Sequence, residues 1–319
     1  MIITVAGGKG GTGKSMVATS LAIEYAKKGK MFLVDADVEC PNDHLLLDIP
    51  LRKEKTIFQP IPKWDYDLCS QCGKCAQVCK QEAIAFIPGK NPAFVEDLCI
   101  GCKACFVACP VQAISETFKE IGTIHRGSNY NIDLISGELK LGQLASGEIV
   151  SAVRKFADAA KTQEKPEFMI IDAAAGIGCP VIASIVGSDY LVAVTEPTPS
   201  ALHDLKRMLY LAKHFKIPHG IIINKFDLEE QFCEKIVKFA ETEKIQIIGK
   251  IPYSKKFVDA TLKMKPVGEL FPNFIPFFTD LSEKVTHIIK RLNSDKDKRI
   301  KKNVMKRTDH EIFHDRPYQ

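Results

Sequence analysis

Apolar and polar positions along the chain predict strands and helices that follow one another in alternation. The N-terminal part has the pattern of a strand at 2–6, a Gly-rich turn at 7–13, a helix at 15–28 and a strand at 31–35. This is a βαβ beginning. The continuous apolar runs at 191–194 and 220–224 suit strands that are buried on both faces of a parallel sheet. The pattern therefore predicts the α/β class, with a doubly wound and mostly parallel sheet.

The alternation is interrupted by a segment rich in Cys and Pro and by a candidate hairpin at 121–141. Beyond it, helices are predicted at 147–161, 200–215 and 229–243, and strands at 169–172, 190–195, 219–224 and 246–251. An insertion at a surface loop leaves a sheet intact. We therefore expect one discontinuous α/β domain formed by residues 1–58 and 120–293, with a small inserted module at 59–119.

Composition narrows the class of protein. With 45% apolar and 26% charged residues in 319, the chain has the ordinary make-up of a soluble protein with a real core. No apolar run reaches the roughly 18 residues that a membrane span needs, and the N-terminus begins directly as a strand without a signal peptide. A cytoplasmic protein without membrane insertion is expected.

The net charge of +5 belongs to the C-terminal segment. Residues 290–319 hold ten Lys or Arg against five Asp or Glu, so the rest of the chain is balanced and gives no argument for nucleic acid binding. In the basic tail at 294–319, Ile300 and Val304 make too thin an apolar face for a membrane or nucleic-acid foot. A solvated tail, either disordered or a weakly ordered helix, is expected.

A phosphate-binding loop lies between the first strand and the first helix. Residues 8–15 match the pattern G-x-x-x-x-G-K-[ST]. Glycines let backbone N–H groups turn toward phosphate oxygens, Lys14 brings a positive charge to the β and γ phosphates, and Ser15 offers its hydroxyl to Mg²⁺. The motif predicts a nucleoside triphosphate and Mg²⁺ at this site.

A second lysine in the loop, Lys9, makes the string KGGTGKS at 9–15, which resembles the deviant Walker A motif of the MinD/ParA superfamily and the nitrogenase iron protein. The resemblance implies a P-loop ATPase in which this lysine reaches the nucleotide of a partner subunit. It therefore implies an ATP-dependent homodimer, or a heterodimer with a paralogue. The loop residues implied to contact the nucleotide are Gly8, Lys9, Gly10, Gly11, Thr12, Gly13, Lys14, Ser15 and Met16.

Acidic residues after two strands extend this resemblance. Asp35 and Asp37 resemble switch I, where carboxylates hold Mg²⁺ through water and position the attacking water, and Asp37 is the better candidate for the catalytic role. Asp172 resembles the Walker B aspartate and closes a buried strand at the edge where α/β sheets bind ligands. Gly176 resembles the switch II turn that senses the γ-phosphate. The implied catalytic residues are Lys9, Lys14, Asp37 and Asp172.

Three further stretches bear on the nucleotide site. Residues 173–175 are all Ala where relatives often have proline, which leaves the kinetics of switch II open. Asn224 begins an N-K-x-D string like the one that reads guanine in GTPases, but on this backbone the asparagine normally contacts adenine, so ATP is favoured over GTP. Residues 195–198 resemble a loop beside the nucleotide, and an ordinary turn explains them equally well.

Eight of the eleven cysteines form two runs of four. This clustering, without a secretion signal, favours a metal site over disulfides. The segments that follow the runs, 81–84 and 111–114, also match, so the module is an internal duplication. The C-x2-C-x2-C-x3-C spacing resembles two-cluster bacterial ferredoxins and implies two [4Fe-4S] clusters in an α+β module. The runs are Cys69, Cys72, Cys75 and Cys79, and Cys99, Cys102, Cys105 and Cys109.

The resemblance also implies which cysteines share a cluster, because the fourth cysteine of each run points to the other cube. Lys80 replaces the usual proline after the first run without removing a ligand, and its charge favours a higher potential. Two zinc sites are the alternative, although structural zinc usually pairs two C-x2-C knuckles. Cluster 1 would be held by Cys69, Cys72, Cys75 and Cys109, and cluster 2 by Cys79, Cys99, Cys102 and Cys105.

Three cysteines lie outside the runs. Cys179 lies seven residues after Asp172, and the nitrogenase iron protein carries a cluster-binding cysteine in its switch II. A metal or cluster at a dimer interface and a small buried thiol are therefore both open for Cys179. Cys40 follows switch I, and Cys233 is expected in the core.

These features favour an ATP-binding and ATP-hydrolysing iron-sulfur protein that couples nucleotide state to electron transfer with a redox partner. One alternative is an ATPase scaffold that assembles a cluster or delivers it to a cluster-accepting protein. The other is a spatial organiser with a redox sensor. Stable, redox-active clusters would favour electron transfer, and a labile extra cluster that depends on Cys179 would favour delivery.

Overall fold

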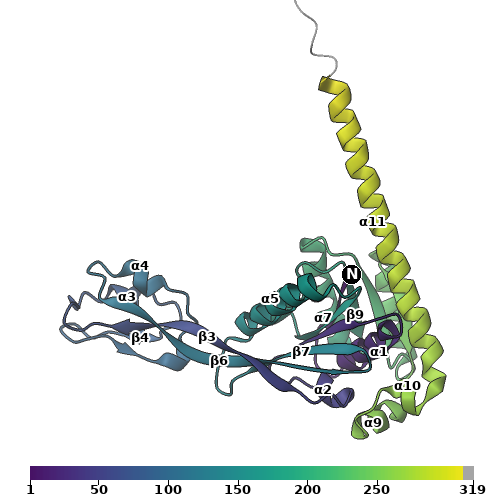
Figure 1. Cartoon of the computed structure of the whole chain (residues 1–319), viewed down its shortest axis with the longest axis horizontal. Coiled ribbons are helices and arrows are strands. Elements are labelled where there is room, and N and C mark those ends of the chain that lie inside the picture. The colour runs from purple at the N-terminus through teal and green to yellow at the C-terminus, as the bar shows by residue number, and fades with distance from the viewer. Residues whose placement is uncertain (312–319) are drawn as a thin grey trace, which may run out of the picture.

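A nine-stranded sheet forms the centre of the molecule (Figure 1). The computed structural model describes residues 1–311, with side chains through residue 294, and its sheet has the order β11-β10-β9-β1-β8-β2-β7-β6-β3. The pairs that join the first seven strands of this order are parallel, and the predicted mostly parallel sheet is thereby confirmed. These strands are β1 (Ile2–Gly7), β2 (Met31–Ala36), β7 (Ile132–Leu139), β8 (Met169–Ala175), β9 (Tyr190–Thr195), β10 (His219–Asn224) and β11 (Gln246–Ile251).

Helices cover both faces of the sheet. On one face, alternate strand residues pack with α1 (Lys14–Ala26) and α11 (Ile275–Glu311). The other face packs with α5 (Ser146–Glu164), α6 (Cys179–Ile185), α7 (Pro199–His214) and α8 (Glu230–Thr242). Burial on both faces is why the strands read as continuous apolar runs. Short helical elements complete the body: α2 (Asp43–Leu46), α9 (Lys255–Leu262), α10 (Val267–Leu270) and a 3-10 turn at Pro272–Phe274.

The observed bounds follow the predicted ones closely in the body. The strands predicted at 190–195, 219–224 and 246–251 are β9, β10 and β11. The tail expected from residue 294 continues α11 as a helix to Glu311, while residues 312–319 lie outside the described part. Within the described residues, the helices are too short or too polar to cross a membrane.

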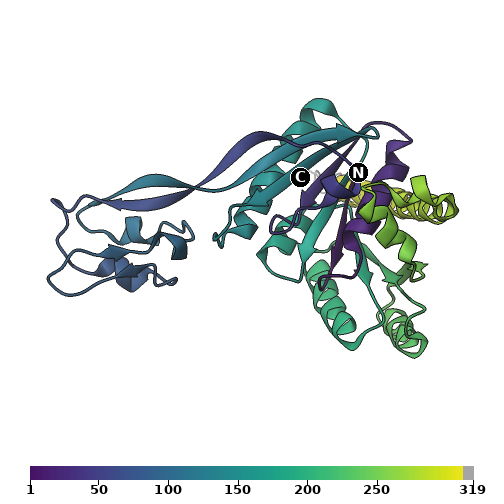
Figure 2. The ribbon, with the colours of Figure 1, turned by 90° about the horizontal axis from the view of Figure 1, so that it is seen from below.

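Strands β3 (Arg52–Trp64) and β6 (Ile114–Asn129) form an antiparallel ribbon that leaves the body and carries the cysteine module at its far end (Figures 1 and 2). Their register runs from Arg52 opposite Arg126 to Trp64 opposite Ile114. The expected domain boundaries at 58 and 120 therefore fall inside two strands of the large sheet. The module contains α3 (Lys74–Val78), β4 (Ile84–Ala85), β5 (Ala93–Phe94), a 3-10 turn at Glu96–Leu98, and α4 (Ala104–Ala108).

Candidate functional site

The phosphate loop joins the end of β1 to the start of α1. Gly11 and Gly13 have φ angles of 78° and 91°, in the left-handed region that glycine adopts without strain. A Cβ on Gly13 would also lie 2.3 Å from Nδ2 of Asn224, so space and conformation both require glycine there. Lys14, the first residue of α1, is buried. The loop thus presents a helix N-terminus and a lysine, the arrangement that binds phosphate.

Neighbouring elements brace this loop. Nδ2 of Asn224, at the end of β10, donates to the Thr12 carbonyl at 2.8 Å. The Gly176 N–H, just after β8, donates to the Gly7 carbonyl at 3.1 Å, which ties the switch II turn to the loop. Met16 is half-buried on α1. The predicted contact of Asn224 with adenine stays a prediction, since its amide group here holds Thr12.

Two buried carboxylates lie side by side below the loop. Asp35 in β2 and Asp172 in β8 are paired in the sheet register. Burial raises the pKa of Asp172 to about 7, while Ser15 and Lys14 act to lower it. Burial, and then the charge of Asp172, raise the pKa of Asp35 well above its usual range. Among residues 1–294, neither carboxylate oxygen of Asp172 has a hydrogen-bond partner. Orphaned carboxylate oxygens beside a serine hydroxyl are the donor set that Mg²⁺ takes.

The switch I residues surround Asp35. Its carboxylate accepts the backbone N–H groups of Asp37, Asn42 and Asp43 at 3.2, 2.9 and 3.2 Å. Asp37 itself is half-buried, and burial raises its pKa while Lys14 opposes the effect. The hydrogen bonds fix the path of the chain after Asp35, and they leave Asp37 where the charge of Lys14 acts on its carboxylate.

Asp43 was not singled out from the sequence. It is fully buried at the first residue of α2, and neither of its carboxylate oxygens finds a hydrogen-bond partner in the described chain. Burial, and then the charge of Asp35, raise its pKa well above the usual range. After Asn42, an Asp reads as an ordinary helix start. The sequence feature that could have indicated this residue is a further acidic position eight residues after Asp35.

Glu196, directly after β9, connects two lysines of the site. Its Oε1 lies 2.8 Å from Nζ of Lys9 and its Oε2 lies 2.9 Å from Nζ of Lys225. Burial acts to raise the pKa of Glu196, but hydrogen bonds from the two lysines outweigh it and hold the pKa below its usual value. Lys225 also donates to the Gly11 carbonyl at 2.9 Å. Through Glu196, the stretch at 195–198 therefore contacts the phosphate loop and pairs with Lys9 of the same chain.

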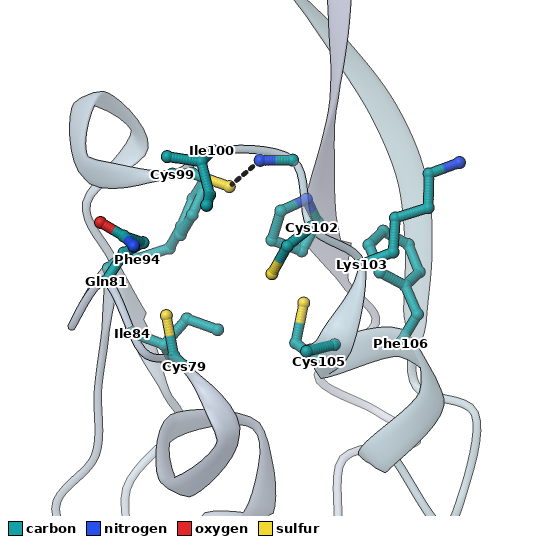
Figure 3. Close-up of a pocket in the computed structure, with 14 residues that line it drawn as sticks. Cys79, Gln81, Ile84, Phe94, Cys99, Ile100, Cys102, Lys103, Cys105 and Phe106 are labelled. Carbon is teal, nitrogen blue, oxygen red and sulfur yellow. Dashed lines mark hydrogen bonds between the residues drawn. The ribbon is translucent and has the colours of Figure 1, made fainter. Parts of the chain in front are cut away.

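Four cysteines of the module line one cavity (Figure 3): Cys79, Cys99, Cys102 and Cys105. Apolar side chains close it, among them Ile84 and Phe94. Burial raises the pKa of the Cys105 thiol to about 11, so a thiolate here needs a bound cation to compensate its charge. Through residue 294, no three His, Cys, Asp or Glu side chains converge tightly enough for a single metal ion. The four thiols line one shared cavity, and cysteine thiolates are the ligands that iron-sulfur clusters take.

The other predicted set is spread over the same module. Cys75 is buried, Cys69 and Cys109 are half-buried, and Cys72 is exposed. Cys75 shares a small core with Cys105 and Trp64. Sγ of Cys109 accepts the Ala113 N–H at 3.2 Å.

The cysteines outside the module differ in exposure. Cys233 is buried, as predicted, whereas Cys40 and Cys179 are exposed. The reading of Cys179 as a small buried thiol is therefore wrong. Cys179 begins α6 against Gly147 at the start of α5, where a Cβ would lie 2.8 Å from the Cys179 Cβ, and this surface packing leaves the thiol open.

Strand order, phosphate loop and strand-end carboxylates together define a P-loop nucleotide-binding ATPase domain. Residues 3–267 match the CobQ/CobB/MinD/ParA nucleotide binding domain. The chain belongs to this family.

The chain is also similar to individual proteins. It is 33% identical over 276 residues to an uncharacterized protein of Methanocaldococcus jannaschii, covering 85% of this chain and 91% of that protein. It is 23% identical to the iron-sulfur cluster carrier protein of Pyrococcus abyssi, covering 93% of this chain and 89% of that one. The septum site-determining protein MinD of Pyrococcus horikoshii, solved with Mg-ADP, shares the fold at a TM-score of 0.56 and 18% identity, covering 89% and 95%.

Proposed function

We propose that this protein binds and hydrolyses ATP at the phosphate loop, and that its nucleotide state controls electron transfer through two [4Fe-4S] clusters at the end of the arm. The cavity lined by Cys79, Cys99, Cys102 and Cys105 carries the proposal. It joins the fourth cysteine of one run to the first three of the other, which is the cross-ligation that two-cluster ferredoxins use.

The ATPase chemistry follows from the loop and its carboxylates. Lys14 and the loop N–H groups would hold the β and γ phosphates. Ser15 and Asp172 would hold Mg²⁺, which neutralises phosphate charge when bound. Asp37 would orient the attacking water and accept its proton, since a carboxylate with a raised pKa is a better base near neutral pH. Attack would form a bond between the water oxygen and the γ-phosphorus and break the bond from that phosphorus to the bridging oxygen, giving ADP and inorganic phosphate.

The base of the arm contacts switch I, which offers a route for coupling. The Leu139 N–H, at the end of β7, donates to the Val38 carbonyl at 2.8 Å, and Val38 directly follows Asp37. Strand β7 pairs along its length with β6, one half of the ribbon. A change in switch I on nucleotide binding would therefore move or release the ribbon that carries the module.

Cluster 2 would also be fastened to the ribbon. Nε2 of Gln59 in β3 donates to the Cys99 carbonyl at 2.8 Å, and Nζ of Lys119 in β6 donates to the Glu96 carbonyl at 2.7 Å. Both carbonyls belong to the segment that begins the second cysteine run. A twist of the ribbon would therefore change the surroundings of cluster 2 before those of cluster 1.

The test begins with anaerobic purification, in which about eight irons and eight sulfides per chain are expected from two cubes. Asp37→Ala protein, expected to bind ATP without hydrolysing it, is then titrated by EPR with and without ATP and Mg²⁺. A shift of about 59 mV would equal about 1.4 kcal/mol for a one-electron couple, within the range of about 1–3 kcal/mol for coupled sites. The matched control carries Lys14→Ala in addition. Zinc in place of iron, or superimposable titrations, would contradict the proposal.

Cluster delivery is the second candidate, favoured by the similarity to the iron-sulfur cluster carrier protein of Pyrococcus abyssi and by the exposed thiol of Cys179. In that case a labile cluster in addition to the two of the module should depend on Cys179. Iron above eight per chain that is lost in Cys179→Ser, and passed to an apo-ferredoxin in wild type, would favour delivery.

A further inference from the structure

Trp64, the one tryptophan of the chain, ends β3 where the ribbon enters the cysteine module. Its indole Nε1 is buried and has no hydrogen-bond partner in the described part of the chain. A buried donor without an acceptor bears the full cost of losing its hydrogen bond to water, and native structures rarely keep one without a reason. The indole N–H therefore points to an acceptor that belongs to a bound group.

The neighbours of Trp64 suggest which group this is. The side chain packs against a small core that contains Cys75 and Cys105, and its ring lies 5.4 Å from that of Phe94. Trp64 and Cys75 therefore lie in the same small core at the end of the ribbon, and Cys75 is a ligand of the proposed cluster 1.

The internal duplication shows how the two cluster sites differ. Trp64 and Phe94 are 30 residues apart and occupy equivalent positions: Trp64 lies opposite Ile114 in the β3–β6 ladder, and Phe94 lies opposite Ile84 in the β4–β5 ladder. The backbone hydrogen bonds are equivalent as well. The Asp65 N–H donates to the Ala113 carbonyl, and the Val95 N–H donates to the Ala83 carbonyl, each at 2.8 Å.

Phe94 lines the cavity that would hold cluster 2 (Figure 3). By the duplication, Trp64 has the same relation to cluster 1. Phenylalanine has no donor, whereas tryptophan has an N–H at the ring edge. The two sites therefore differ at this position by one hydrogen-bond donor.

Resting on the function proposed above, we propose that the Trp64 indole donates a hydrogen bond to a sulfur of cluster 1 and raises its reduction potential above that of cluster 2. Reduction adds one electron to the cube and moves no proton. The reduced cube is the more negative, so a donor to its sulfur favours it. An electron shared by the two clusters would then reside mainly on cluster 1, the one held at Cys75.

Trp64→Phe makes the two positions alike and tests the proposal. In an anaerobic EPR titration against dithionite, one midpoint should fall and the other should stay. At a fixed potential, the ratio of reduced to oxidised cluster should drop about three- to tenfold, a tenfold change being 59 mV for one electron. Phe94→Leu is the control, because it removes a ring without removing a donor, and it should leave the midpoint that depends on Trp64 in place. Unchanged midpoints in Trp64→Phe, or the same shift in Phe94→Leu, would overturn the proposal.

The wild-type protein gives an independent measurement that does not depend on a folded variant. Because Trp64 is the one tryptophan, ¹⁵N-indole labelling reports on a single position. In the reduced protein with eight irons, ENDOR should detect hyperfine coupling of this nitrogen to a cluster. Full clusters without such coupling would refute the role of Trp64 alone, whereas wild-type protein without iron-sulfur clusters would refute the proposed function and this inference with it.

Discussion

Neutralising Glu196 should strengthen the ATP-dependent dimer that the resemblance of the phosphate loop, with its second lysine Lys9, implies. In the structure, the Glu196 carboxylate lies 2.8 Å from Nζ of Lys9, the lysine that resembles the one acting across the dimer in MinD relatives. To reach a partner's nucleotide, Lys9 must leave this ion pair. Glu196→Gln keeps the shape of the side chain and removes the charge that holds Lys9 in its own subunit.

The size of the effect follows from the exposure of the pair. The Lys9 side chain is 31% exposed and that of Glu196 is 12% exposed, so solvent screens much of the attraction. Pairs of this kind contribute up to about 1 kcal/mol, and Lys225 retains part of the carboxylate's influence by pairing with its other oxygen. An energy of about 1 kcal/mol per subunit corresponds to a roughly fivefold change in an equilibrium constant.

The assay is sedimentation with ATP and Mg²⁺ in an Asp37→Ala background, where hydrolysis does not consume the nucleotide. Glu196→Gln should lower the dimer dissociation constant by up to about fivefold for each Lys9 that it releases, and the gain should shrink at high salt. Repeating the substitution on Lys9→Ala isolates the pair in a double-mutant cycle. Ser200→Ala, which removes the 3.4 Å contact of Lys9 and a 3.4 Å contact with Thr198 but keeps the ion pair, is the matched control. A weaker dimer in Glu196→Gln, or the same gain without Lys9, would refute the reasoning.

Further outcomes are expected at the two sites. Lys9→Ala should reduce ATP hydrolysis far more than ATP binding, whereas Lys14→Ala should damage both, and undiminished turnover in Lys9→Ala would exclude action in trans. Since the pKa of Asp172 is about 7 without ligand, its carboxylate is protonated below and charged above that pH. The affinity for Mg²⁺ in the presence of ATP, measured by calorimetry, should therefore rise between about pH 6 and 8. In Asp172→Asn this dependence on pH should be lost. Cys79→Ala should remove the cluster of the cavity and leave about four irons, and Cys109→Ala should remove the other; loss of the same EPR signal in both would contradict the cross-ligation.

Local patterns were sufficient where chemistry depends on residues close in the chain. A phosphate loop needs glycines and Lys14 within one turn, and buried parallel strands need continuous apolar runs, so β1, β9, β10 and the loop could be predicted from the sequence. The cysteine spacing and its 30-residue duplication are equally local. In each case the residues that form the pattern lie within a short segment of the chain.

Contacts between distant segments were decided by tertiary structure alone. The ribbon was hidden because β3 is an edge strand whose pairing partner lies far along the chain, and prolines at 60 and 62 obscure its pattern. In the sequence, Glu196 looks like an ordinary turn residue. The sheet order places β9 beside β1, and this brings the Glu196 carboxylate to Lys9. In the sequence, Asp43 looks like an ordinary helix start, and only the tertiary structure shows that its carboxylate is buried away from water. Residue types and spacing therefore determined which chemistries were available to this protein, and packing determined which charged and donor groups face one another.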